Sequence, residues 1–307
     1  MPKYFLGFIR LNYLVKMQWK TVGFNKIKDF FEKAAKSGSL AHAYLFSGQE
    51  MIGKKTFALE LIGLVNHKLE VNPNPENVIN PDLLLVDAGS SESGQTISIE
   101  EIRKVKNFIS LSPVVGPYKF VVMDNAHLMT TEAQNALLKV LEEPSPSSIL
   151  ILVTANPNSL LPTIISRCQE IKFPPHPAEA IKKFLDNSGL PKSEAEFLAE
   201  FSNGRVGLIK TVLREKSFGV IKGSVEDLIH LIKADINERL AAAQELADEK
   251  NKQDLMRKVL YWILYMRMRI NEPKAPRILK GLLELHKIIS QPQFNHRLAL
   301  ENFLVQL

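Results

Sequence analysis

The sequence predicts an α/β domain built on a parallel β-sheet, followed by a helical region. Four apolar runs alternate with helical patterns, and turn-forming residues bound each run. Near-continuous hydrophobic strands of this kind are typical of a parallel sheet covered by helices on both faces. At FPPHP, residues 173–177, three prolines in five positions interrupt the pattern, and helical periodicity follows to the end. A length of 307 residues fits two or three domains.

The expected strands come from short, strongly apolar stretches. They are AYLFSG (43–48), DLLLVD (82–87), KFVVMD (119–124), SILILVT (148–154) and a shorter fifth run, QEIKF (169–173). The clearest helix is TTEAQNALLKVLEEP (130–144), whose apolar residues recur at helical spacing. Thr131 with Gln134 predicts a capping box at its start, and Pro144 predicts its end.

Composition and charge restrict the class of protein. The chain is 45% hydrophobic and 23% charged, with a net charge of +6 that is scattered along the sequence. A single cysteine, Cys168, excludes an internal disulfide and a cysteine-rich zinc site. Among the first twenty residues, Arg10 and Lys16 interrupt the apolar stretch. The segment fits neither a signal peptide nor a membrane span. We expect a cytoplasmic protein without a membrane partner.

A phosphate-binding loop is predicted between the first strand and the helix that follows. Gly48, Gly53 and Lys54 have the spacing G-x-x-x-x-G-K, and such a loop between strand and helix holds phosphates with backbone N–H groups. The next residue normally supplies a hydroxyl to Mg²⁺, but here it is Lys55, which has no acceptor atom. Thr56 has a hydroxyl one position later, roughly 100° further round the helix. Magnesium coordination is therefore not expected.

A second departure lies at the end of the third strand. Asp124 is placed to serve a metal, but Asn125 stands where a nucleotide hydrolase usually has a glutamate that activates water. A carboxamide cannot accept the proton, and the nearby His127 is more typical of a structural role. The metal ligand and the water-activating base are thus altered in two separate motifs, which indicates that the chain has lost nucleotide hydrolysis.

Long stretches of the chain resemble the clamp-loader subunits of bacterial DNA polymerase III, which are AAA+ proteins, and among them the δ′ type. The stretches are WKTVGFNKIKDFFEKAAKSGSLAHAYLFSGQEMIGKKT, the segment KFVVMDNAH to CQEIKF with its NALLKVLEEP and TIISRC motifs, and the tail NHRLALENFLVQL. The resemblance implies a P-loop α/β domain with a five-stranded parallel sheet, a small helical lid and an all-α collar. The expected domains are 17–174, 175–212 and 213–307, with 1–16 as an extension before Met17.

The resemblance also implies a role for the segment Ser166, Arg167 and Cys168. In the family, this motif presents an arginine to the ATP bound by a neighbouring subunit. A planar, permanently charged guanidinium suits the charge on a transferring phosphoryl group. We therefore expect Arg167 to act in trans, as an arginine finger.

Other family features are altered or absent in the sequence. Gly207 stands at the position of the lid arginine that contacts nucleotide, and Arg205 is displaced from it by two residues. The stretch 65–86 lacks the four cysteines of many relatives, and His67 alone cannot hold a structural zinc, so no metal is expected. Residues 19–23 would line the adenine side of the pocket in active relatives.

The sequence therefore favours a non-hydrolysing clamp-loader subunit of the DNA polymerase III complex. Its implied partners are γ/τ and δ subunits in a pentameric ring and, through the complex, the sliding clamp and primer–template DNA. No cofactor is expected to be required; binding of ATP or ADP with weak or no hydrolysis stays open. The apolar faces of 262–270 and 278–289 are expected to divide between core and subunit contacts. The alternatives are an active γ-type ATPase, in which Thr56 rescues the metal, and a small-molecule kinase.

Overall fold

The computed structural model describes residues 19–66, 80–88, 96–186, 188–247, 252–290 and 295–307. The expected extension 1–16 and His67 lie outside these ranges. The chain forms two compact units, one ending at His176 and the other beginning at Pro177. The border thus falls inside the proline-rich segment FPPHP. The further border expected at residue 212 stays a prediction.

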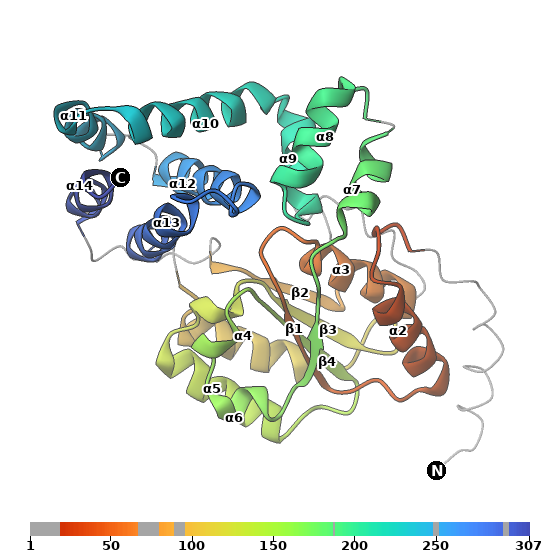
Figure 1. The fold of residues 1–307 in the computed structure, drawn as a ribbon. Helices are drawn as coiled ribbons and strands as arrows, with labels where there is room; N and C mark the ends of the chain where they lie inside the picture. Colours follow the sequence, from red (N-terminus) through yellow and green to blue (C-terminus); the bar gives the residue numbers. More distant parts are fainter. Residues whose placement is uncertain (1–18, 67–79, 89–95, 187, 248–251, 291–294) are drawn as a thin grey trace, which may run out of the picture. The chain divides into compact units, whose positions relative to one another are not determined.

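The N-terminal unit is built on a five-stranded parallel sheet, as predicted (Figure 1). The strand order is β2-β3-β4-β1-β5, and each neighbouring pair is parallel. The strands are β1 (Ala43–Ser47), β2 (Leu83–Val86), β3 (Lys119–Met123), β4 (Ser148–Thr154) and β5 (Gln169–Lys172). The helices are α2 (Asn25–Ser37), α3 (Lys54–Val65), α4 (Ile99–Ile109), α5 (Thr131–Glu142) and α6 (Pro162–Ile165), with two short 3₁₀ turns at Ala126–Leu128 and Pro157–Ser159.

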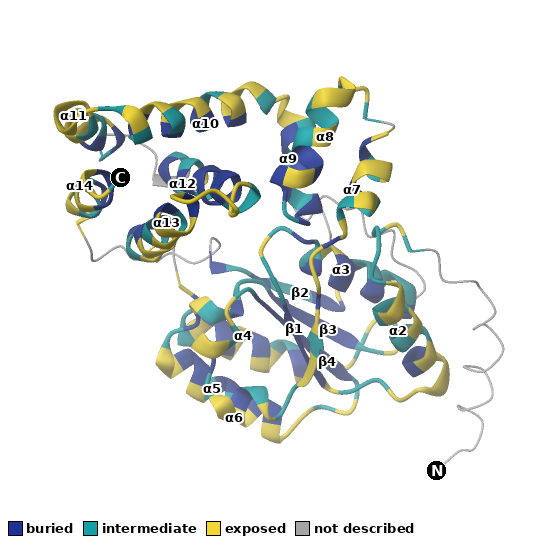
Figure 2. Cartoon of the chain, in the orientation of Figure 1, coloured by how far each residue is buried: buried dark blue, intermediate teal, exposed yellow. Residues whose placement is uncertain are grey.

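Side chains alternate between the two faces of the sheet, because successive residues of a strand point to opposite sides. One face carries residues such as Leu45 and Val121, which pack with α4 and α5 in one apolar core. The other carries Phe46 and Val122, which pack with α2 and α3 in a second core. The central strands are therefore buried on both sides (Figure 2), which explains their nearly continuous apolar sequences.

The start of α5 differs from the prediction by one residue. Thr130, not Thr131, is the N-cap, and its hydroxyl oxygen accepts the N–H of Ala133 at 3.2 Å. Gln134 is not part of a capping box. Its side chain is buried, donates to the carbonyls of Met129 and Ser159, and accepts the N–H of Leu161 at 2.8 Å. Gln134 thus ties α5 to the segment that leads into α6.

The C-terminal unit is helical throughout the ranges described. Its helices are α7 (Ala178–Leu185), α8 (Lys192–Phe201), α9 (Val206–Glu215), α10 (Phe218–Lys233), α11 (Ile236–Ala247), α12 (Lys252–Met268), α13 (Ala275–Ile289) and α14 (His296–Val305). Helix α12 is central, because α8, α10 and α13 all pack against it. Its residues 261–266 are all buried, and the indole of Trp262 donates to the carbonyl of Ser224 at 2.7 Å. No helix in the described part of the chain combines the length and apolar character needed to cross a bilayer.

Candidate functional site

The phosphate loop, residues 48–53, joins β1 to α3 at the carboxyl edge of the sheet. Gly48 and Gly53 have φ angles of +148° and +102°, which only glycine adopts without strain. At Gly48 a Cβ would also approach the Phe173 carbonyl oxygen to 2.4 Å, so no side chain fits there. Lys54 is buried, and its ammonium donates to the carbonyls of Gly48 and Gln49 at 2.6 and 2.5 Å. The predicted loop residues therefore meet in one place, with Lys54 held against the loop itself.

Lys55 is engaged by two carboxylates. Its ammonium lies 3.1 Å from Asp124 Oδ2 and 3.2 Å from Asp87 Oδ2. Asp124 follows β3 and Asp87 follows β2, and the carboxyl ends of neighbouring parallel strands meet at one edge of the sheet. Burial alone would lower the pKa of Lys55, but pairing with Asp124 and Asp87 raises it above its usual value. The ammonium therefore stays charged and joins the ends of β2, β3 and the start of α3.

Asp87 was not among the predicted site residues, although the sequence contained a signal for it. The runs DLLLVD and KFVVMD both end in an aspartate directly after a buried strand. Because β2 and β3 are adjacent and in register, Val86 lies beside Met123, and the following aspartates come together. The pairing of β2 with β3 was the missing information.

The residues after Asp124 form a tight turn. None of the contacts there provides a base that could activate water. Asn125 has φ +52°, and its backbone N–H donates to Asp124 Oδ1 at 3.0 Å. His127 Nδ1 lies 3.3 Å from the hydroxyl of Thr154, at the end of β4. Burial lowers the pKa of His127, which favours its neutral form. These contacts support the structural role predicted for His127.

The segment before α2 contacts α3 through an aromatic pair. Trp19 stacks on Phe57 with ring centroids 4.6 Å apart, and the indole N–H donates to Glu32. A Cβ on Gly23 would lie 2.8 Å from the ring of His176, whose Nε2 is 3.1 Å from the Ile52 carbonyl oxygen. The segment 19–23 is thus fixed beside the phosphate loop.

Arg167 lies near the amino ends of the strands, whereas the phosphate loop lies at their carboxyl ends. It precedes β5, whereas the loop follows β1, and β1 and β5 are parallel. The four residue steps from Gln169 to Phe173, which packs on Gly48, already span about 13 Å at 3.3 Å per residue. Arg167 is therefore remote from the phosphate loop of its own chain.

The side chain of Arg167 is partly exposed and makes two polar contacts. It donates to Glu142 Oε1 at 2.8 Å and to the Thr163 carbonyl oxygen at 3.0 Å. The Arg167 and Glu142 side chains are 36% and 49% exposed, and ion pairs of this kind contribute about 0–1 kcal/mol. Glu142 also lines a pocket of about 390 Å³ between α4 and α5. The arginine can thus exchange its partner at little cost.

Ser166 and Cys168 shape the turn around Arg167. The hydroxyl of Ser166 donates to the Thr163 carbonyl oxygen at 3.2 Å. Burial raises the pKa of the Cys168 thiol to about 12, and the side chain packs against the core beside α5 and α6. A protonated thiol is a poor nucleophile. Of the three residues, Arg167 is the one with a chemical group suited to a phosphate partner.

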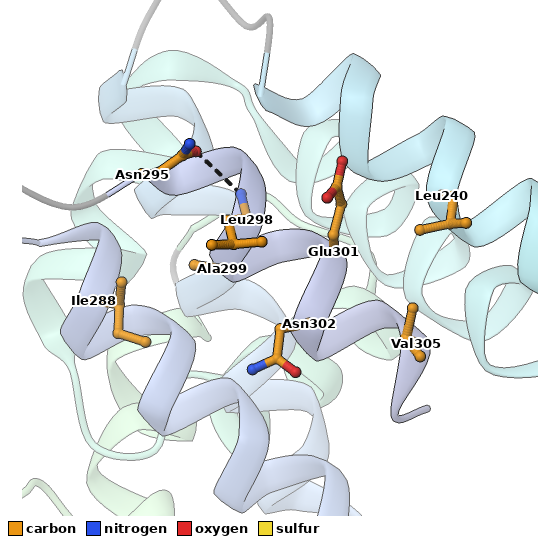
Figure 3. A pocket seen from close by; sticks show the side chains of 8 residues that line it. All are labelled: Leu240, Ile288, Asn295, Leu298, Ala299, Glu301, Asn302 and Val305. Carbon is orange, nitrogen blue, oxygen red and sulfur yellow. Dashed lines mark hydrogen bonds between the residues drawn. The ribbon is translucent and has the colours of Figure 1, made fainter.

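Two further observations concern the C-terminal unit. Arg205 is buried and directly precedes α9, and its guanidinium lies 3.5 Å from the Ser202 carbonyl oxygen. A pocket of about 620 Å³ lies among α11, α13 and α14 (Figure 3). Its lining is mostly apolar or uncharged and its one charged group is a carboxylate, so it does not suit a polyphosphate. The lining residues are Leu240, Ile288, Asn295, Leu298, Ala299, Glu301, Asn302 and Val305.

Comparison with known proteins identifies similar sequences. The profile of the family described as "DNA polymerase III, delta subunit" matches residues 23–177. DNA polymerase III subunit tau of Bacillus subtilis is 28% identical over 298 residues, which cover 87% of this chain and 52% of that protein. DNA polymerase III subunit delta' of Bacillus subtilis is 34% identical over 174 residues, which cover 53% of this chain and 51% of that protein. The chain thus spans about half the length of these relatives.

A solved structure shares the fold. The gamma subunit-related protein of Thermotoga maritima aligns with 92% of this chain and 97% of its own, with a TM-score of 0.50 and 22% identity. At this identity the likeness bears on the fold alone.

Proposed function

Because the chain belongs to the DNA polymerase III delta-subunit family of AAA+ clamp-loader proteins, we propose that it is a non-hydrolysing subunit of a clamp loader. In this role it donates Arg167 to a nucleotide held by an adjoining subunit and helps to load a sliding clamp onto primed DNA. The observation that carries the proposal is the separation of two features. At the carboxyl ends of the strands Lys55 pairs with Asp124 beside the phosphate loop, whereas the partly exposed Arg167 lies near their amino ends.

The loss of hydrolysis is supported by three positions. Lys55 supplies an ammonium where a hydroxyl would bind metal, and this ammonium engages Asp124. Asn125 cannot act as a base. Thr56 is exposed on α3, and the contact with Asp124 comes from Lys55. The rescue by Thr56 on which the γ-type ATPase alternative depends therefore finds no support in this geometry.

The action of Arg167 in trans is supported by the direction of the sheet. An arginine about 13 Å or more from the loop of its own chain can reach only a nucleotide bound elsewhere. Its exposed pair with Glu142 is weak enough to be replaced by a stronger contact with a phosphate. An adjoining subunit that contains a complete ATP site is the partner that this geometry fits.

Assembly through the C-terminal unit is supported by exposed apolar side chains. Leu240 on α11 and Leu298 and Val305 on α14 are 39%, 63% and 47% exposed, and all three line the pocket of Figure 3. Apolar groups gathered in this way are typical of contact surfaces. We assign them to contacts with γ/τ- and δ-type subunits in a ring.

The experiment compares ATP hydrolysis by the purified chain and by the complex reconstituted with its γ/τ- and δ-type partners. We expect negligible turnover by the chain alone. In the complex, Arg167→Ala should lower turnover at the affected site by roughly 10³-fold or more. Arg103→Ala is a matched control, because Arg103 is also an exposed arginine paired with a glutamate of the same unit. Robust magnesium-dependent turnover by the chain alone, or an unchanged Arg167→Ala complex, contradicts the proposal.

A further inference from the structure

The three charged groups at the carboxyl edge of the sheet form a compact cluster. The Lys55 ammonium lies between Asp87 and Asp124 at 3.2 and 3.1 Å, and the three side chains are 30%, 38% and 19% exposed. Each comes from a different element, because Lys55 is in α3 and the aspartates follow β2 and β3. A single cation thus bridges carboxylates from two strands, which is an arrangement that metal ions commonly adopt in proteins.

The residues present do not fit a magnesium ion at this place. Mg²⁺ requires close to six oxygen ligands in octahedral geometry at about 2.0–2.1 Å. Residue 55 supplies no oxygen, Asp124 Oδ2 contacts the ammonium, and Asp124 Oδ1 accepts the N–H of Asn125. Across the described ranges, no group of three or more His, Cys, Asp and Glu side chains is arranged to hold a metal. A divalent cation would have to displace Lys55 and meet its positive charge at close range.

We infer that the Lys55 ammonium takes the place of the divalent cation in this loop and excludes such a cation from the site. The ammonium offsets part of the negative charge of the two aspartates and joins the strand ends, so that the site keeps its shape without metal. The inference extends the proposed function, from which it takes the interpretation of the loop as a former ATP site. Exclusion of the cation by Lys55 can be tested on the isolated chain, without its partners.

The expected consequence is that removal of the ammonium exposes a cation site. Lys55→Met keeps most of the aliphatic stem and removes the charge, so Asp87 and Asp124 are left facing each other. Both carboxylates lie within 3.2 Å of the position of the ammonium, so their like charges repel once it is removed, and a divalent cation relieves the repulsion. Lys55→Thr also removes the charge and adds a hydroxyl at the position from which a P-loop protein binds metal.

The test is a titration of the full-length chain with Mn²⁺, in which electron paramagnetic resonance measures the free ion. We expect Lys55→Met to bind Mn²⁺ roughly tenfold or more tightly than the unchanged chain. Lys55→Thr should bind Mn²⁺ at least as tightly as Lys55→Met does. It replaces Lys55→Met in the titration if the methionine variant fails to fold. Adding Asp124→Asn should abolish the gain. Thr56→Ala is the matched control, because Thr56 is the exposed neighbour in the same helix, and it should leave Mn²⁺ binding unchanged.

Thermal unfolding gives a second measurement, because a ligand that binds the folded state raises the Tm. Millimolar Mn²⁺ at constant ionic strength should raise the Tm of Lys55→Met or Lys55→Thr and not that of the unchanged chain. Equal Mn²⁺ affinity in the unchanged chain and both variants overturns the inference, and so does the absence of binding in both variants. These outcomes are independent of Arg167 and of the complex, so failure here is distinguishable from failure of the proposed function.

Discussion

Asp82 offers the sharpest test of how the N-terminal unit is held together. It precedes β2, its side chain is fully buried, and its carboxylate accepts the N–H groups of Val114, Val115 and Gly116 at 2.7, 2.6 and 2.9 Å. The ammonium of Lys119, the first residue of β3, is also buried and lies 3.6 Å from the same carboxylate. Asp82 therefore fixes the loop before β3 at the edge of the sheet opposite the Lys55 cluster.

We predict that Asp82→Asn destabilises the unit by about 3–5 kcal/mol. The amide oxygen of asparagine can replace one carboxylate oxygen, so the N–H of Val114 or those of Val115 and Gly116 face an NH₂ group. An unsatisfied buried donor costs about 1–3 kcal/mol. Breaking a buried ion pair on one side costs about 3–5 kcal/mol in total, because Lys119 loses its counter-ion. The two costs overlap, and Lys119 still donates to the Pro81 carbonyl oxygen at 3.0 Å, so we expect a total of about 3–5 kcal/mol rather than their sum.

The assay is urea unfolding in a Trp262→Phe background, so that fluorescence reports Trp19 in the N-terminal unit. The chain contains two tryptophans, and Trp262 lies in the C-terminal unit. Asp29→Asn is the matched control, since Asp29 is exposed, and it should change the free energy of unfolding by no more than about 0.5 kcal/mol. A loss below about 1 kcal/mol for Asp82→Asn at neutral pH would refute the reasoning.

The contribution of Asp82 to the free energy of unfolding should depend on pH in a defined direction. Burial alone would raise the pKa of Asp82, but the three N–H donors and then Lys119 hold it below its usual value. The unfolded chain therefore binds the proton more readily than the folded chain. The stabilising contribution is fully present above the unfolded pKa, about 4, and is lost as the pH falls through the folded pKa. The difference between the unchanged chain and Asp82→Asn should shrink in acid, and a difference that widens there would contradict this assignment.

Three further predictions concern the proposed contacts. Glu142→Gln releases an exposed ion pair worth about 0–1 kcal/mol, so turnover of the reconstituted complex should change less than about fivefold, far less than with Arg167→Ala; equal losses would make Glu142 as necessary as the arginine. Leu298→Glu should leave the Tm of the isolated chain unchanged, because the side chain is 63% exposed, and weaken assembly about tenfold or more in gel filtration with the partners; normal assembly would remove α14 from the contact surface. Gly23→Ala should destabilise the chain by about 1–3 kcal/mol in urea unfolding, because φ is +70° and the new Cβ meets His176; an unchanged midpoint would show that the segment before α2 adjusts freely.

The strands were predictable because their signal is local. Each apolar run from 43–48 to 169–173 contains the observed strand, and the ends differ by no more than a residue or two. In β1, β3 and β4 burial on both faces favours apolar residues, so the run itself marks the strand, whereas β5 (Gln169–Lys172) is mostly polar and exposed. The departures at Lys55 and Asn125 were equally visible, since each is a substitution within a short pattern.

Other features depend on contacts between distant segments. The pairing of Lys55 with Asp87 follows from β2 lying beside β3, which no local pattern specifies. Gln134 fitted a capping box by spacing, yet the structure uses it to join α5 to the segment before α6. The apolar stretch that begins at Trp262 could equally have faced a partner, and the packing of α8, α10 and α13 around α12 determines that its residues 261–266 are buried.

The parallel direction of the five strands has a consequence for geometry beyond a single molecule. In the proposed complex, a chain that offers Arg167 from the amino ends of its strands and has its phosphate loop at their carboxyl ends would meet its neighbours through unlike surfaces. Contacts between unlike surfaces repeat in one rotational sense and either close into a circle or continue as a spiral. A protomer that holds a lysine in place of the divalent cation would end the series of hydrolytic sites, so Lys55 would mark the last position in the proposed assembly.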